Sequence, residues 1–135
     1  MSATNMSYSW GEHVGELELH LQAADEAGVF AAAVRALGEL LGDEGDAREW
    51  IAVSADGEDR ATLLAAWLEE LVFLGEHDGL VPVGVRDVVL EPTRVAAQVG
   101  AYRGDPPHLV KAVTYHRLAF ERRAGAWRAT VVLDV

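Results

Sequence analysis

The most informative absence from this chain of 135 residues is cysteine, of which there is none. A chain without thiols forms no disulfide, has no thiolate nucleophile and offers no sulfur ligand to a metal ion. The sequence also lacks a run of about 18 apolar residues, and its N-terminus does not join basic residues to an apolar block. We therefore expect a soluble, cytoplasmic protein that makes no contact with a membrane.

Lysine is almost absent as well. Ten arginines supply most of the positive charge, and Lys111 is the single lysine. An ammonium is a compact charge on a flexible stem, and its pKa moves readily on burial, unlike that of a guanidinium. Lys111 is therefore a candidate for a specific role. The plainer alternative is an amphipathic strand in the alternating stretch 108–120, with Lys111 on the face of Val113 and Tyr115 and its ammonium in solvent.

Positive charge is scarce overall, with a net charge of −11. This argues against a free-standing nucleic-acid binder, which normally carries a basic surface. Residues 1–80 contain 17 acidic residues and 3 arginines, whereas residues 81–135 contain 5 acidic and 8 basic residues. This asymmetry suits a protein that docks on a charged surface or gathers carboxylates around a cation. Solvated helix faces in an acidic protein would explain it equally well.

Hydrophobic periodicity predicts an α+β fold, with residues 1–9 as a flexible N-terminal leader and residues 10–135 as one domain. The expected order is β-α-β-α followed by a run of antiparallel strands, with two helices packed on a single mixed or antiparallel sheet in two layers. The predicted helices begin after Asp25 and at about Asp59. The predicted strands are 15–23, 49–55, 81–90, 94–102, 109–115, 116–122 and 127–135.

The side chains that could carry chemistry are three carboxylates, two histidines and the lysine. They are Glu16, Asp43 and Asp134; His13 and His116; and Lys111.

Asp134 lies near the end of a valine-rich strand, where aspartate is uncommon, although a carboxylate there is ordinarily solvated. If Glu16, Asp43 and Asp134 converge, three carboxylates need a cation or a shared proton. A ligand set of oxygens alone favours calcium or magnesium over zinc. His13 or His116 could act as a base, but the sequence contains no nucleophile motif, phosphate-binding loop or zinc motif beside them.

The order of these residues resembles the archease family, from about residue 11 to the C-terminus. The segments that carry the resemblance are Glu12–Glu16 before the first predicted strand, an aspartate after the first helix, Lys-Ala-Val-Thr-Tyr-His at 111–116, and the ending Val-Leu-Asp-Val. The family usually has His-Thr-Ala-Asp where this chain has His-Val-Gly-Glu at 13–16. A threonine hydroxyl is therefore lost, and the carboxylate is one methylene longer.

The resemblance implies an accessory protein rather than an enzyme. Archeases assist RtcB-type RNA ligases in tRNA splicing and RNA repair, and they promote guanylylation of the ligase and its multiple turnover. The RNA is then contacted indirectly, through the ligase. The family's metal site corresponds to Glu16, Asp43 and Asp134, with Ca²⁺ as the expected ion and Mg²⁺ or another divalent cation as the alternative. Lys111 corresponds to the family's functional lysine.

Two other functions stay open. A general chaperone or modulator of a tRNA-modifying enzyme would use exposed apolar side chains and charge, and would not depend on Glu16 or Asp134. A metal-dependent hydrolase of phosphorylated small molecules would use the same carboxylates, but the sequence has no nucleophile and base motif to support it.

Overall fold

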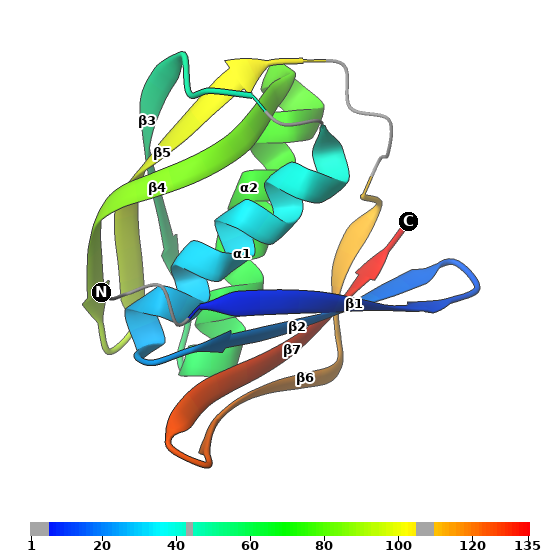
Figure 1. The fold of residues 1–135 in the computed structure, drawn as a ribbon, viewed down its shortest axis with the longest axis vertical. Helices are drawn as coiled ribbons and strands as arrows, with labels where there is room; N and C mark the ends of the chain where they lie inside the picture. The colour runs from blue at the N-terminus through cyan, green and yellow to red at the C-terminus, as the bar shows by residue number, and fades with distance from the viewer. Residues whose placement is uncertain (1–5, 43–44, 105–109) are drawn as a thin grey trace.

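The computed structural model describes residues 6–42, 45–104 and 110–135, and the side chain of His13 is also outside the description. The class is α+β, as expected, with two helices packed against antiparallel strands (Figure 1). The elements in chain order are β1 (Ser7–His13), β2 (Glu16–Ala23), α1 (Glu26–Leu41), β3 (Glu49–Asp56), α2 (Arg60–Asp78), β4 (Leu80–Glu91), β5 (Arg94–Arg103), β6 (Ala112–Arg123) and β7 (Ala126–Asp134).

The strands form two antiparallel sheets, where the sequence pattern predicted one. Sheet A has the order β1-β2-β7-β6, and sheet B has the order β3-β5-β4. Helix α1 packs on β2 and β4, and α2 packs on β6 and β3, so the helix pair lies between the two sheets (Figure 1). Two sheets form because the apolar surface of α1 is broad, and nine of its 16 residues are buried. A single sheet covers one stripe of a helix, and a second sheet is needed to cover the rest.

Sheet A joins the two ends of the chain. Strand β1 begins at Ser7, so the last part of the segment expected to be a leader lies in the sheet. Strand β2 pairs with β7, with Glu16 as the Cα partner of Asp134 and Ala23 as the partner of Trp127. The sequence pattern could not predict this pairing, because alternation defines the faces of a strand and not its neighbours.

Aspartates begin both helices, as expected. The Asp25 carboxylate accepts the N–H of Gly28 at 2.7 Å, and the Asp59 carboxylate accepts the N–H of Thr62 at 2.8 Å. Each carboxylate satisfies an amide of the first turn that has no partner within the helix, and each favours the positive end of the helix dipole.

The core lies between the sheets and is centred on the two helices. Trp67 of α2 is fully buried, and its indole N–H donates to the carbonyl of Phe30 on α1 at 3.2 Å. A Cβ on Gly38 of α1 would lie only 2.1 Å from the carbonyl oxygen of Pro82 on β4. Only glycine therefore allows this helix to approach sheet B so closely.

Strand β6 is one strand with a bulge, whereas the sequence pattern predicted two successive strands. Thr114 is the Cα partner of Val132, but the next paired residue, Ala119, faces Thr130. Four residues of β6 therefore lie opposite one residue of β7. Arg117 is in this bulge and has a positive φ of 57°. Bulges of this kind redirect side chains, and this one has consequences for the candidate site.

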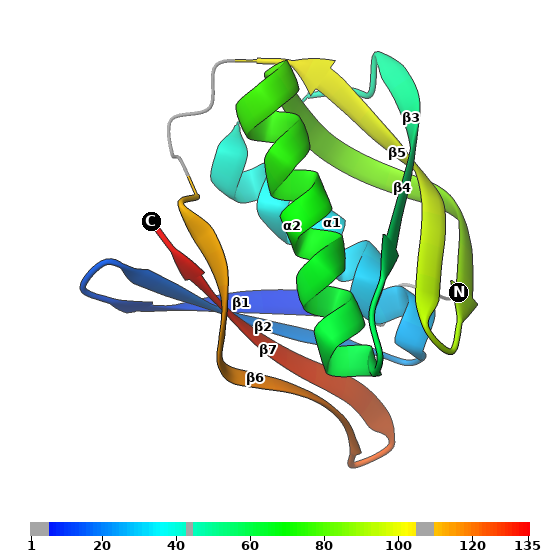
Figure 2. The same ribbon diagram turned by 180° about the vertical axis from the view of Figure 1, so that it is seen from behind.

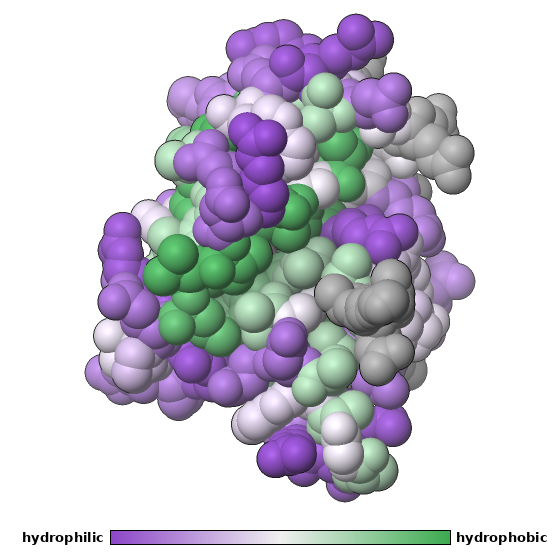
Figure 3. All heavy atoms as spheres, turned by 60° about the vertical axis from the view of Figure 1, so that its left-hand side comes forward, coloured by the Kyte–Doolittle hydropathy of each residue, from purple (hydrophilic) through white to green (hydrophobic). Residues whose placement is uncertain are grey.

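The face that carries β4 exposes apolar side chains. Figure 3 brings this side forward and shows apolar side chains bordered by hydrophilic ones. Val89 of β4 is 57% exposed, and Val83, Val85, Val88 and Leu90 of the same strand are only partly buried. Within the described part of the chain, neither helix is long and apolar enough to cross a membrane.

Candidate functional site

Two of the predicted site residues meet at one edge of sheet A. Glu16 begins β2 and Asp134 ends β7, and the antiparallel pairing makes them direct Cα partners. Directly opposite residues point to the same face of a sheet. The next pair, Leu17 and Leu133, faces the core, and Leu133 is fully buried. The carboxylates of Glu16 and Asp134 therefore share the outer face.

Lys111 adjoins the same edge. Its backbone N–H donates to the carbonyl of Asp134 at 2.7 Å, one residue before β6 begins. The side chain is exposed, and its ammonium forms no hydrogen bond or ion pair with any other residue that the structure describes. An exposed ammonium of this kind is available to an external anion such as a phosphate.

The other predicted residues are placed less fully. Asp43 lies outside the described residues. His13 is the Cα partner of Glu16 in β1, but its side chain is outside the description. His116 lies exposed in the β6 bulge, and its backbone N–H donates to the hydroxyl of Thr114 at 3.3 Å. The His116 ring forms no hydrogen bond or ion pair with an acid or a nucleophile in the described segments, so its role as a base stays a prediction.

Arg117, which the sequence analysis did not single out, bridges this edge. Its Nε–H donates to Glu18 at 2.7 Å, and a terminal guanidinium nitrogen lies 3.7 Å from a carboxylate oxygen of Glu16. Glu18 also lies 3.0 Å from the ring of His20. Because β7 lies between β2 and β6, the Arg117 side chain reaches over Val132, which explains why Val132 is fully buried on the outer face.

The oxygen chemistry of this edge suits a hard divalent cation. Glu16 and Asp134 supply two carboxylates from neighbouring strands. Among the residues that the structure describes, no three His, Asp or Glu side chains are grouped closely enough to hold a metal ion. A complete ligand set therefore needs a further donor, and Asp43 is the predicted one. The cation that the structure itself places at Glu16 is the guanidinium of Arg117.

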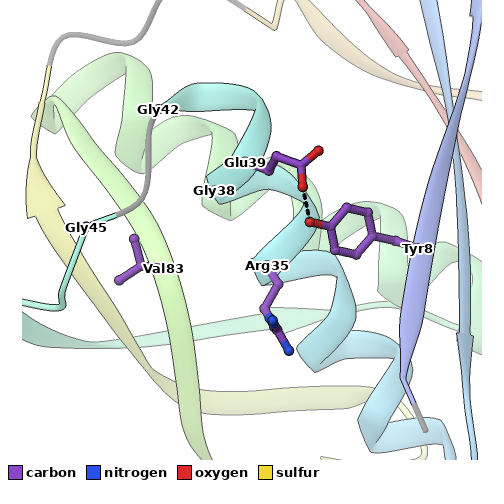
Figure 4. Close-up of a pocket in the computed structure, with 7 residues that line it drawn as sticks. All are labelled: Tyr8, Arg35, Gly38, Glu39, Gly42, Gly45 and Val83. Carbon is purple, nitrogen blue, oxygen red and sulfur yellow. Dashed lines mark hydrogen bonds between the residues drawn. The ribbon is translucent and has the colours of Figure 1, made fainter. Parts of the chain in front are cut away.

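A pocket separate from this edge lies between β1, α1 and β4 and has a volume of about 390 Å³. The Tyr8 hydroxyl donates a short hydrogen bond to the Glu39 carboxylate (Figure 4). Burial raises the pKa of Tyr8, and the bond to Glu39 raises it further. Two of the lining glycines, Gly42 and Gly45, are the described residues that flank residues 43–44 in the sequence. The lining residues of the pocket are Tyr8, Arg35, Gly38, Glu39, Gly42, Gly45 and Val83.

The fold and the sheet edge together define a class: a small α+β protein whose helix pair lies between two antiparallel sheets, with two carboxylates paired at one sheet edge. The sequence profile of the Archease protein family (MTH1598/TM1083) matches residues 8–135. This chain belongs to the archease family.

Curated relatives and solved structures agree with this assignment. The protein archease of Methanopyrus kandleri is 31% identical over 134 residues, covering 92% of this chain and 96% of the relative. That of Methanosarcina barkeri is 31% identical over 149 aligned positions, covering all of both chains. The solution structure of Methanobacterium thermoautotrophicum protein 1598 has a TM-score of 0.78 at 25% identity, covering 95% and 98% of the two chains.

The crystal structure of an archease, described as a possible chaperone, from Thermotoga maritima has a TM-score of 0.69 at 21% identity. It covers 93% of this chain and 94% of its own. At that identity the likeness supports the fold.

Proposed function

We propose that this protein activates an RtcB-type RNA ligase, promoting guanylylation of the ligase and its multiple turnover in tRNA splicing or RNA repair. Membership of the archease family supports an accessory role of this kind. The observation that carries the proposal is the edge of sheet A, where Glu16 faces Asp134 and the Lys111 backbone is bonded to Asp134. The acidic net charge suits contact with the ligase protein rather than with an RNA backbone.

The residues of this edge have separate roles in the proposal. Glu16 and Asp134, with Asp43 as the predicted third ligand, hold a divalent cation, with calcium as the first candidate and magnesium as the alternative. Such a cation supplies positive charge to the phosphates of the nucleotide. Lys111 contributes a flexible ammonium that contacts a phosphate oxygen at the nucleotide site of the ligase. Guanylyl transfer depends mainly on the positioning of the phosphates and on neutralisation of their charge.

The proposal is tested by measuring ligase guanylylation with the wild type, Lys111→Ala and Lys111→Arg. We expect Lys111→Ala to lose most of the stimulation. Lys111→Arg should keep only part of it, because a planar guanidinium does not reproduce a compact ammonium. Arg122→Ala is the matched control, since it removes another exposed cation from the far end of β6. Equal stimulation by all four proteins would remove Lys111 from the mechanism.

A second function, as a general chaperone or modulator of a tRNA-modifying enzyme, is supported by the description of the Thermotoga maritima protein as a possible chaperone. Such a role would use exposed apolar side chains, of which Phe73 and Tyr115 are 53% and 56% exposed. In that case Phe73→Ser would reduce protection of a client enzyme against aggregation, and Lys111→Ala would not. The reverse pattern in the guanylylation assay favours the ligase activator.

A further inference from the structure

The outer face of sheet A differs in charge between its two ends. Glu16 is the Cα partner of Asp134 at the acidic end, and further along the same pair of strands Gln22 is the partner of Arg128. A strand advances about 3.3 Å per residue, so these two ends are roughly 20 Å apart. Figure 2 shows the β6–β7 turn at the bottom of the molecule, at the opposite end of β7 from the C-terminus. The end of the face beside this turn is therefore separate from the edge that carries Lys111.

A groove of about 410 Å³ lies on the sheet at the Arg128 end, a volume typical of sites for small molecules. All four strands of the sheet contribute to its lining, and the lining side chains that alternation places on the outer face are all polar or charged. The remaining lining residues belong to the inner face. Leu21 and Ala129 are buried in the core, and the Tyr8 hydroxyl is bonded to Glu39 of α1. The groove therefore offers charge and hydrogen-bond donors rather than an apolar contact.

Two arginines in this groove lack a close carboxylate partner. Arg128 of β7 is exposed, and its guanidinium forms no hydrogen bond or ion pair with any other residue that the structure describes. Its Cα partner on β6 is Glu121, but the Glu121 carboxylate lies 3.6 Å from Nε of Arg123 instead. An exposed ion pair at that distance contributes little free energy. Both guanidinium groups can therefore bind an external anion.

The positions of the two arginines allow them to hold one anion together. Arg123 is two residues beyond Glu121 on the same strand, so Arg123 and Arg128 are diagonal neighbours on one face of the β6–β7 pair. Diagonal neighbours of this kind are about 7 to 8 Å apart at Cα, within reach of long side chains. The single carboxylate of Glu121 offsets only one of the two positive charges. A net positive charge therefore remains in the groove, although the whole protein carries −11.

His20 and Thr130 form a fixed wall of the groove. Nε2 of His20 lies 3.0 Å from a carboxylate oxygen of Glu18, and Nδ1 lies 3.4 Å from the Thr130 hydroxyl oxygen. A neutral imidazole that donates Nε2–H to Glu18 accepts the Thr130 hydroxyl at Nδ1, so these partners hold the ring in one tautomer and one orientation. The lining hydroxyls of Ser7 and Ser9 on β1 remain as donors to a ligand.

The pair of arginines favours a phosphate group over a carboxylate. A single guanidinium binds both oxygens of a carboxylate, which leaves nothing for a second arginine. A terminal phosphate has three oxygens and a charge of about −1.5 to −2 at neutral pH, so it can bind two guanidinium groups at once. The phosphate of a phosphomonoester therefore matches the number and the charge of the groups at Arg123 and Arg128.

The surroundings of the groove favour a small ligand over a nucleic-acid chain. Glu18 and Glu16 follow along the same face of β2, so successive phosphates that continued along the sheet would meet carboxylates. The net charge of −11 also repels a polyanion. A small ligand interacts mainly with charges within one Debye length, which is about 8 to 10 Å at physiological salt. The local positive charge of the groove therefore decides its binding.

We propose that this groove is a binding site for a small phosphomonoester, such as a sugar phosphate. Arg123 and Arg128 bind the phosphate, and the hydroxyls of Ser7 and Ser9 form hydrogen bonds to the rest of the ligand. The site includes neither Lys111 nor the carboxylates of the opposite end. Loss of phosphomonoester binding and loss of ligase stimulation would therefore be separate results.

Calorimetric titration with ribose 5-phosphate tests the site, with ribose as the uncharged control. The wild type should bind ribose 5-phosphate and should not bind ribose. Arg128→Gln and Arg123→Gln should each weaken binding by roughly tenfold or more, because each removes a charged hydrogen-bond donor. Arg122→Gln is the matched control, since it changes the net charge equally at an exposed position of β6 outside the groove. Its affinity should equal that of the wild type.

Glu121→Gln tests the same geometry through a gain of affinity. It removes the carboxylate that competes with the ligand for Arg123. Binding of ribose 5-phosphate should tighten by roughly two- to fivefold, in proportion to an exposed ion pair. Equal unfolding midpoints for all four variants and the wild type would confirm that the changes in affinity come from the groove.

Three outcomes would overturn the proposal. One is a wild type that shows no binding up to about 10 mM ribose 5-phosphate. Another is equal affinity of Arg128→Gln and Arg122→Gln, which would place the bound phosphate elsewhere. The third is tighter binding of a short single-stranded RNA than of ribose 5-phosphate, lost in Arg128→Gln, which would assign the groove to a nucleic acid.

Discussion

Sheets A and B pack on the same helix pair, but their outer faces are different. The outer face of sheet A carries charged side chains, among them Glu16, Glu18 and Asp134. The outer face of sheet B has small uncharged side chains such as Ala52 and Ala96 at its centre. The comparison teaches that the shared core determines the fold, whereas the side chains on the two outer faces can differ in charge and in function.

Irregular backbone is also used differently in the two sheets. In sheet A, the bulge of β6 carries Arg117 across β7 to the acidic residues of β2. In sheet B, two register shifts interrupt the edge strand β4, whereas the edge strand β3 pairs with β5 in a single register. The irregular backbone therefore builds a charged site in sheet A and interrupts one edge of sheet B.

The largest loss of stability should come from a substitution in the core that the two sheets share. Trp67→Ala leaves a large cavity in the core beside α2 and removes the hydrogen bond to the Phe30 carbonyl. We expect a loss of about 3 to 5 kcal/mol in the free energy of unfolding, measured by chemical denaturation. Phe73→Ala, at an exposed position of the same helix, is the control and should have a much smaller effect. Similar losses for both variants would contradict the assigned core.

A pair of valines distinguishes the two outer faces. Val132 on sheet A is fully buried beneath the Arg117 side chain, whereas Val89 on β4 is 57% exposed. Val132→Ala should cost about 1 to 3 kcal/mol of unfolding free energy, because buried methyl groups are lost. Val89→Ala should be nearly neutral. Equal costs in denaturant titrations would show that the bulge does not cover sheet A.

Two arginines test the charged edge of sheet A. Arg117→Gln removes partly exposed ion pairs, so it should cost less than about 1 kcal/mol, and the cost should shrink at high salt. It should also tighten calcium binding in calorimetric titration, because Arg117 no longer competes for Glu16. Arg94→Gln breaks the ion pair with Asp56 on sheet B and should leave calcium binding unchanged. Unchanged or weaker calcium binding by Arg117→Gln would count against this competition.

The smallest expected effect on stability is at the N-terminus of α2, the helix that packs against both sheets. The hydrogen bond from the Thr62 N–H lowers the pKa of Asp59. A carboxyl with a lowered pKa in the folded state stabilises the fold above its unfolded pKa, and this stabilisation is lost as pH falls through the folded pKa. Asp59→Asn keeps a capping oxygen without the titration. Its unfolding midpoint should therefore fall less steeply than that of the wild type below about pH 4.

Much of the local structure was predictable from the sequence, because period-two alternation is visible in it. Leu19 and Leu21 face the core and Glu18 and His20 face outward, as alternation required. The division into two sheets was not predictable, because it depends on which strands become neighbours. The pairing of β2 with β7 is a contact between the two ends of the chain, and no local pattern specifies it.

The candidate site was also predictable only in part from the sequence. Alternation placed Asp134 on the outer face, but its position opposite Glu16 depends on the strand register. The sequence did not identify Arg117, because the β6 bulge interrupts the alternation at that point. Arg117 has a left-handed backbone conformation in this bulge, which turns its side chain away from the direction that regular alternation predicts. The interruption of the pattern near His116 was the available signal, and it was interpreted as the junction of two strands.

Ligase guanylylation with a matched pair of aspartate variants tests most directly whether the edge of sheet A carries the function. Asp134→Asn removes a carboxylate from that edge, and Asp87→Asn removes an exposed carboxylate from the bulge of β4 in sheet B. We predict that Asp134→Asn loses most of the stimulation and that Asp87→Asn retains it, with equal unfolding midpoints. Full stimulation by Asp134→Asn, or an equal loss in both variants, would contradict this assignment.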